Sequence, residues 1–526
     1  MPQRMLEVNT PLIWHWSHFL DIMALIKKHR FTGLIIHQQN ILALLAKPSR
    51  YYQGADKTNL NHEREQALLY LQRVSRYCRE QRLTFWLQGE AFPEDGTLEH
   101  KFPEFSFTQD AAAGENFLLY FYRDVVTESL SQLPLIDGII LSLQTPVFHQ
   151  AQWTAPLKLF HRYLRDHQQK MVLRDYTDDS WPRRQLPTTL AELPPDVRAS
   201  VKATATDYRP GFANNPVIGA FEQRKVWIDI DLWGIDYGWT LLPCLLIDEI
   251  QGRLSWVQSV IGDDLEAVTV RISWEWINNC PLSDSVNDIN LFGLALMLSS
   301  ERPVSAVSLL DDWLYAKDIR PSGSPQRQAI HQLYFSSHDW MCRTPYLLGR
   351  MMHQHSQLPS DINSAQRLLH ADNRSANWTQ SYQPLFPASS PSKGLEQREL
   401  ISIEQQQSEF LARHLQKQAR DLQQSGILPP ELGATLVAAW ERANWYTQVF
   451  SQVRQLISNH LYSGQYGDEA GRLLLLQAQQ ISSACRCAEK LDNWLIQAPD
   501  AHPDALRIMM DPQRLESLAS DCRSTK

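Results

Sequence analysis

The sequence contains no long hydrophobic run. No stretch of about 18 uncharged apolar residues occurs among its 526 residues, so we expect no transmembrane helix. Its first seven residues, MPQRMLE, do not show a basic start followed by an apolar segment, and we expect no signal peptide. Positive charge is not in excess either, because 50 Lys and Arg face 58 Asp and Glu. The resulting net charge of −8 argues against nucleic acid or a membrane surface as the main partner.

Cysteine is sparse and shows no pairing pattern. The chain has seven cysteines, an odd and scattered set that is typical of a reducing cytoplasm. The close pair Cys485 and Cys487 matches no common zinc or thioredoxin signature. No Gly-x-Ser-x-Gly elbow and no Gly-rich phosphate turn occurs. We therefore expect a cytoplasmic protein that needs no metal or organic cofactor.

Short apolar runs alternate with amphipathic segments over about the first 270 residues. The candidate strands are Met5–Asn9, Gly33–His37, Leu83–Gln88, Gly138–Leu143, Lys170–Asp175, Ser200–Thr206, Val226–Leu232 and Ala267–Ser273. Strand and helix alternation predicts a parallel sheet, and eight such strands predict a closed (β/α)8 TIM barrel over residues 1–320. A doubly wound open sheet is the alternative, and the missing phosphate turn disfavours it.

The remainder of the chain has a helical pattern. Residues 291–358 are helical in periodicity, whereas Asn363–Lys393 is rich in Ser, Asn, Gln and Pro and indicates a loop or linker within a segment 321–394. Long helical stretches at 395–424, 430–462 and 468–496 predict a C-terminal helical domain over residues 395–526. The apolar run Leu473–Leu476 must be buried, on the barrel or in a homodimer through these helices.

The candidate site residues follow from the predicted barrel, because active sites of this fold lie at the C-terminal ends of the strands. Amides and carboxylates bind sugar hydroxyls, aromatic rings stack on sugar faces, and two carboxylates perform acid–base chemistry at a glycosidic bond. These residue types occur at or just beyond the strand ends, as His37, Asn40, Glu90, Arg174, Lys202, Asp207, Tyr208, Trp233, Asp236, Trp274, Glu275 and Trp276.

Each of these residues also has a structural interpretation. The tryptophans can pack in the core, and Asp207 can cap a loop. Arg174 and Lys202 can pair inside the barrel with neighbours such as Asp175 or Asp229. Asp229 and Asp231 lie two apart on one strand and face the same way, which indicates either a salt-bridge network or part of the site.

One segment resembles a known family. Residues 202–219, KATATDYRPGFANNPVIG, resemble with the same spacing the Lys…Asp-Phe…Pro…Gly stretch of the bacterial α-glucuronidases of glycoside hydrolase family 67. Further similarity lies in residues 33–40, 83–90, 172–175, and 272–273 running on to 290–293. The resemblance covers about residues 5–320 as a barrel and a helical C-terminal region, without the N-terminal β-domain of the family.

The resemblance implies an inverting glycosidase. Asp207 falls on the position of the family's base, and Asp236 looks like its partner Glu replaced by Asp. Arg174 and Lys202 match the basic residues that hold the uronate carboxylate, an arrangement of strong charge-assisted hydrogen bonds.

The sequence departs from the family at the general acid. The family places it after the fourth strand, where this chain reads SLQTP at residues 142–146. Glu90 and Glu275 are the available replacements by position. We expect hydrolysis of an oligosaccharide that carries a uronic acid or a similar acidic sugar. The alternatives are a carbohydrate-binding barrel without catalysis, or a sugar-acid isomerase or lyase on the same fold.

Overall fold

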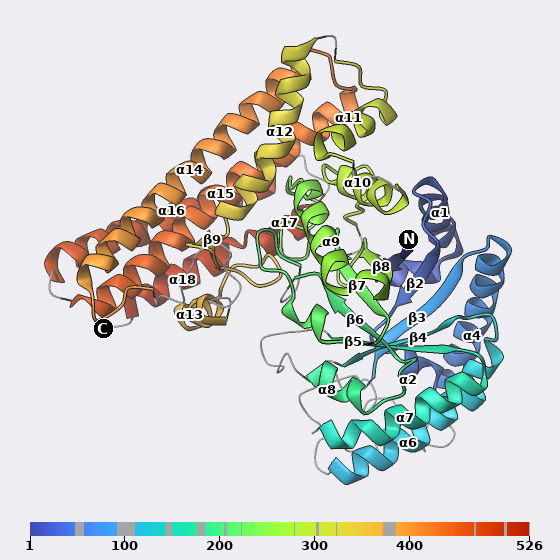
Figure 1. Ribbon diagram of the computed structural model, residues 1–526. Coiled ribbons are helices and arrows are strands. Elements are labelled where there is room, and N and C mark those ends of the chain that lie inside the picture. The colour runs from blue at the N-terminus through green and yellow to red at the C-terminus, as the bar shows by residue number, and fades with distance from the viewer. Residues whose placement is uncertain are drawn as a thin grey trace.

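The computed structural model describes residues 1–47, 57–91, 111–143, 150–175, 185–204, 208–221, 223–277, 279–300, 304–321, 323–371, 385–467, 470–498 and 502–524. Within these residues the N-terminal half is a closed barrel of parallel strands, and long helices extend from it (Figure 1). The predicted (β/α)8 barrel is confirmed. In the described part of the chain, no helix combines the length and hydrophobicity that a membrane span requires.

The barrel strands pair in sequence order, and β1 closes the ring against β8. They are β1 (Gln3–Val8), β2 (Gly33–His37), β3 (Thr84–Glu90), β4 (Gly138–Leu143), β5 (Lys170–Asp175), β6 (Arg198–Lys202), β7 (Val226–Asp231) and β8 (Leu265–Arg271). The connecting helices are α1 (Trp16–Lys28), α2 (Ile41–Leu45), α4 (Lys57–Glu80), α6 (Ala111–Glu128), α7 (Gln150–Asp166), α8 (Gln185–Ala191) and α9 (Ile247–Ile261). Every strand was predicted, with ends that differ by a few residues.

The helical region follows β8. It comprises α10 (Asp288–Ser299), α11 (Ala306–Ala316), α12 (Ser324–Arg343), the short pair β9 (Tyr346–Leu347) and β10 (Arg350–Met351), α13 (Ile362–Ala371), α14 (Pro391–Gln424), α15 (Pro430–Gln465), α16 (Ala470–Gln497), α17 (Pro503–Met509) and α18 (Pro512–Ser524). Helix α15 lies between α14 and α16 (Figure 1). Of the predicted apolar run, Leu473 is buried, whereas Leu474 and Leu475 are each 63% exposed and do not pack on the barrel.

The predicted loop at residues 363–393 is wrong at both ends. Its first part is helix α13, because Ile362, Ala365 and Leu369 form an apolar stripe at helical spacing and are buried. The Asp521 carboxylate of α18 accepts a hydrogen bond from the backbone N–H of Ile362, at 2.9 Å. The last three residues of the range, beginning at Pro391, are already the first turn of α14. Residues 372–384 lie outside the described residues.

The barrel interior is apolar at one level and polar at the next. The lower layer is Met5, Ile35, Trp86, Ile140, Val172, Trp227 and Ala267. Because side chains alternate along a strand, the residue two positions further on faces the same way. That position holds a polar residue on every one of these strands, namely Glu7, His37, Gln88, Ser142, Arg174, Asp229 and Thr269.

The polar layer is held together by Arg174, which is fully buried. Its guanidinium contacts Glu7 of β1 at 2.7 Å, Gln88 of β3 at 2.6 Å, and also the Asp229 carboxylate of β7. Glu7 in turn lies 2.8 Å from Nδ1 of His37. Burial alone would raise the pKa of Glu7, but Arg174 and His37 outweigh it and hold that pKa well below its usual range. Arg174 is therefore paired inside the barrel with the carboxylates of Glu7 and Asp229.

We expect the variant Arg174→Met to lose about 3–5 kcal/mol of unfolding free energy, because two buried carboxylates then lack their cation. Urea unfolding at pH 7 measures this loss. The control is Lys225→Met, which removes an exposed cation 3.1 Å from Asp264. Such surface pairs contribute about 1 kcal/mol or less. Equal losses in the two variants would contradict the role given to Arg174.

Candidate active site

The C-terminal end of the barrel interior carries charges of both signs. Four buried charged residues lie there. Three of them follow a residue of the polar layer by two positions, namely Glu90, Asp231 and Arg271, and the fourth is Lys202 at the end of β6. Some of the loops at this end are outside the described residues, at 92–110, 144–149, 176–184 and 205–207. Asp207, the predicted base, lies in one of them. This end of the barrel is where the sequence places the site.

The Asp231 carboxylate stabilises a backbone turn, so its oxygens are not open to a ligand. Its Oδ1 accepts hydrogen bonds from the backbone N–H groups of Trp233 at 2.9 Å and Gly234 at 3.2 Å. Its Oδ2 accepts one from the N–H of Ile235 at 3.1 Å and lies 3.3 Å from Arg271. With its lone pairs used in this way, Asp231 orders the start of the loop between β7 and α9, which spans residues 232–246.

Asp236 is also a buried anchor. The predicted partner of the base is 0% exposed, and its Oδ1 accepts a hydrogen bond from the N–H of His355 at 2.8 Å. Its Oδ2 lies 3.4 Å from Nε of Arg209. His355 belongs to the segment that follows β10, so this carboxylate ties the barrel to the helical region. These contacts explain its burial without a role in activating water.

Two residues of the same segment complete this joint. The Ser356 hydroxyl donates to the carbonyl of Ile235 at 2.9 Å and accepts from the N–H of Gly238 at 3.0 Å. The N–H of Ser356 donates to Nδ1 of His353 at 3.1 Å. Nδ1 is thus an acceptor, so the neutral imidazole of His353 carries its proton on Nε2. Glycine is required at 238, where φ is +85° and a Cβ would lie 2.5 Å from Leu242.

The predicted substrate-binding residues lie in different environments. His37 is buried in the polar layer, and burial foremost lowers its pKa, so the neutral ring donates through Nδ1 to Glu7. Asn40 is exposed and precedes α2. Lys202 ends β6 and is 3% exposed. Tyr208 is 1% exposed, and Arg253 lies over its ring at 5.5 Å.

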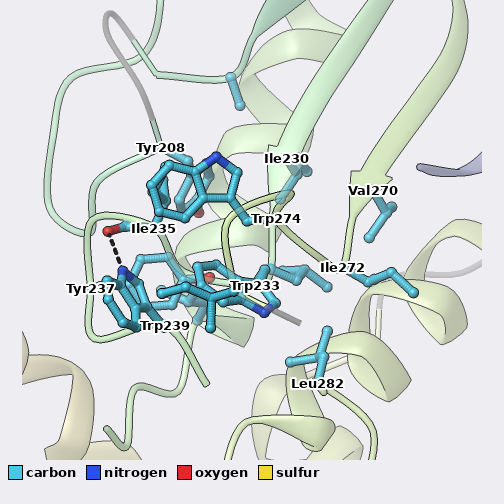
Figure 2. Close-up of a cluster of buried hydrophobic side chains, with 14 of the residues drawn as sticks. Tyr208, Ile230, Trp233, Ile235, Tyr237, Trp239, Val270, Ile272, Trp274 and Leu282 are labelled. Carbon is cyan, nitrogen blue, oxygen red and sulfur yellow. Dashed lines mark hydrogen bonds between the residues drawn. The ribbon is translucent and has the colours of Figure 1, made fainter. Parts of the chain in front are cut away.

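The tryptophans separate into core and surface, and Figure 2 shows those of the core. Trp233 is 1% exposed, stacks on Trp239 with ring centres 5.6 Å apart, and donates from Nε1 to the carbonyl of Cys280. Trp274 is 7% exposed and packs beside both rings, as the figure shows. Trp276 contacts Trp274 at 4.5 Å yet is 65% exposed. Of the three predicted platforms, Trp276 presents its ring to solvent, next to the half-buried Glu275.

Sequence reasoning missed Asn9 at this rim. Asn9 continues the inward phase of Glu7, is 3% exposed, and its N–H donates to the Ser273 hydroxyl at 2.8 Å. Its side-chain Oδ1 is buried and has no hydrogen-bond partner among the residues that the structure describes. A buried acceptor without a partner costs about 1–3 kcal/mol unless a ligand donates to it. The signal was available, since Glu7 and Asn9 lie in phase in the predicted strand Met5–Asn9, whose other residues are apolar.

No set of His, Cys, Asp and Glu side chains within the described ranges could hold a metal ion. The polar groups that the structure brings to the C-terminal end are an amide, carboxylates and cations. This arrangement can bind a hydroxylated ligand and move protons.

We expect His353 to make stability depend on pH. Burial lowers the pKa of His353 to about 3. The nearby Asp236 acts to raise this pKa, whereas the charges of Arg209 and His355 lower it further. The unfolded chain binds this proton below about pH 6.5 and the folded chain does not, so stability falls as pH falls through that range. Between pH 7 and 5 the variant His353→Gln should lose about 2 kcal/mol less than the wild type. Urea unfolding at both pH values measures this difference. The exposed His62→Gln is the control, and an unchanged pH dependence in His353→Gln would refute the interpretation.

Comparison with known proteins supports the fold but does not assign the chain to a family. No protein-family model matches the sequence, and no curated protein sequence matches it. Among solved structures, the chain is similar to a glycoside hydrolase family 138 enzyme targeting pectin rhamnogalacturonan II, with a TM-score of 0.64 and 10% identity over 93% of this chain. The chain spans 63% of the length of that enzyme. A β-N-acetylhexosaminidase from Bacteroides fragilis is also similar, at a TM-score of 0.38 and 12% identity, over 60% of this chain and 69% of that one. The first likeness shows that the fold is shared with a glycoside hydrolase.

Proposed function

We propose that the chain is a glycoside hydrolase that acts at the C-terminal end of its barrel. The observation that carries the proposal is the buried Oδ1 of Asn9, which has no hydrogen-bond partner in the described part of the chain and lies at a rim that also presents Glu90 and Lys202. A sugar hydroxyl is a donor of the kind that this oxygen needs. The exposed ring of Trp276 beside Glu275 adds a surface on which a sugar can stack. The fold shared with a glycoside hydrolase supports the proposal.

We assign the proton transfers to two carboxylates, a base and an acid. Asp207 keeps the role of base that the family 67 resemblance gives it. We give Asp236, expected to activate water together with Asp207, and Asp231 no part in the proton transfers, because their oxygens accept hydrogen bonds from backbone N–H groups and lie next to arginines. Glu90, at the end of β3, and Glu275, in the loop after β8, are the two candidates for the acid. In an inverting mechanism one carboxyl protonates the leaving oxygen and the other activates water.

The substrate that we propose carries a uronic acid or a similar acidic sugar. Its carboxylate requires a cation at the rim. Arg174, one of the two residues in the resemblance, is unsuitable because Glu7 and Asp229 neutralise it below the rim. Lys202 at the end of β6 is therefore the residue that we assign to the carboxylate of the substrate.

The acid can be identified with two substrates of different leaving-group basicity. A nitrophenolate departs without a proton, whereas a sugar alkoxide does not. The variant that removes the acid, Glu90→Gln or Glu275→Gln, should lower kcat/KM about 10²–10⁴-fold on a uronic-acid-bearing oligosaccharide and far less on a nitrophenyl uronide. Asp207→Asn should lower both.

The matched control is Glu80→Gln, an exposed carboxylate at the end of α4 that should change neither rate. If the Asp207→Asn variant hydrolysed both substrates as fast as the wild type, Asp207 would not be the base. If a sugar acid raised the Tm of the wild type and the wild type hydrolysed neither substrate, the protein would be a carbohydrate-binding barrel without catalysis.

Specificity for the acidic group can be tested at Lys202. We expect Lys202→Met to lower kcat/KM at least about tenfold on nitrophenyl uronides, mainly through KM, since a charge-assisted hydrogen bond contributes about 1.5–3 kcal/mol. The same variant should lower kcat/KM only slightly on nitrophenyl glycosides of the corresponding neutral sugar. Lys170→Met, an exposed lysine at the opposite end of the barrel on β5, is the control. An equal loss on acidic and neutral substrates would rule out a contact with the carboxylate.

A further inference from the structure

A polar pocket lies in the helical region, away from the barrel. It lies between α14, α15 and α16, opens to solvent, and has a volume of about 400 Å³. This is the size range of small-molecule sites. Its lining residues are Glu409, Arg413, Asn444, Thr447, Gln448, Ser451, Gln452, Ser483, Arg486, Cys487 and Lys490. No aromatic ring is among them.

The floor of the pocket is formed by α15. Thr447 is 1% exposed, and its hydroxyl is fully used, accepting from Trp340 and donating to the carbonyl of Ala443. Ser451, one turn further along, is 3% exposed, and its Oγ has no hydrogen-bond partner among the described residues. The same holds for Oε1 of the neighbouring Gln452. Two unpartnered polar atoms at the base of a polar pocket indicate that a ligand completes their hydrogen bonds.

The walls of the pocket bring cations from two helices together. Arg413 lies on α14, and Arg486 and Lys490 lie one turn apart on α16. Glu409 is the one lining carboxylate, 3.9 Å from Arg413. Within the described chain, no carboxylate forms an ion pair with Arg486 or Lys490. Three cations against one anion leave the pocket with an excess of positive charge that attracts an oxyanion.

We propose that this pocket binds a hydroxylated anion of monosaccharide size. The acidic group, a carboxylate or a phosphate, lies against Arg413, Arg486 and Lys490. The hydroxyl groups bond to Ser451 and Gln452 and to the amides of Asn444 and Gln448. The absence of an aromatic ring from the lining disfavours a nucleotide, whose base would need a stacking partner. The proposal is independent of the function assigned to the barrel.

Calorimetric titration of the full chain tests the proposal with galacturonic acid, glucose 6-phosphate, glucose and inorganic phosphate as probes. We expect at least one of the two anionic sugars to bind, and to bind more tightly than glucose or inorganic phosphate. The double variant Arg486→Gln/Lys490→Gln should weaken that binding at least about tenfold. The control double variant Lys393→Gln/Arg472→Gln removes two exposed cations, one from α14 and one from α16, outside the pocket and should leave binding unchanged.

Two further variants separate this site from the barrel and from a structural effect. Lys202→Met alters the barrel rim and should leave the pocket's binding intact. Ser451→Ala should weaken binding without lowering the Tm of the ligand-free protein, because the hydroxyl has no hydrogen-bond partner to lose among the residues that the structure describes. Failure of both anionic sugars to bind, or equal binding by the Arg486→Gln/Lys490→Gln variant, would overturn the proposal. A lower Tm of Ser451→Ala would show that the hydroxyl is already satisfied within the fold and would also count against it.

Discussion

The buried pairing of Arg174 with Glu7 and Asp229 is the constraint on which the barrel interior depends. The guanidinium and two carboxyl groups are removed from water there, and their attraction to the guanidinium offsets part of the cost of burying them. The guanidinium on β5 reaches residues of β1, β3 and β7, so it fixes the relative register of strands that do not neighbour one another. Above this layer the interior does not return to an apolar character, and the charges at the C-terminal end continue it. A polar site at the rim is thus a continuation of how the barrel is packed.

The barrel strands could be predicted from the sequence, whereas the ion pairs between side chains inside the barrel could not. Alternation of apolar runs with amphipathic helices depends on local sequence, so all eight strands could be found from it. The partners of Arg174 depend on closure of the barrel, which brings Glu7, 167 positions earlier in the chain, to its side. Sequence reasoning therefore left two interpretations of Arg174 open, a ligand for a carboxylate and a buried charge with internal partners. The contacts of the folded barrel favour the second.

The same physical reason explains which site residues could be found. The sequence WGIDYGW at residues 233–239 has the polar and aromatic character of a binding loop, but segments more than a hundred residues later cover it. Burial of Asp236 follows from that cover and leaves no trace in its neighbours along the chain. Trp276 differs because its ring is 65% exposed among the described residues, so the local expectation of an available aromatic surface still describes it.

The helical region consequently determines part of the barrel's rim. Arg454 of α15 is fully buried and donates to the carbonyls of Thr344 and Tyr346, which fixes the end of α12 and the start of the β9–β10 pair. The Tyr346 hydroxyl donates to the carbonyl of Pro210, in the loop after β6. From the same pair the chain runs on to Ser356, which holds the loop after β7. A change in the packing of the long helices can therefore reach two loops beside the candidate site through rigid, hydrogen-bonded contacts. The helices are in this sense part of the construction of the site, even though none of their residues was predicted to belong to it.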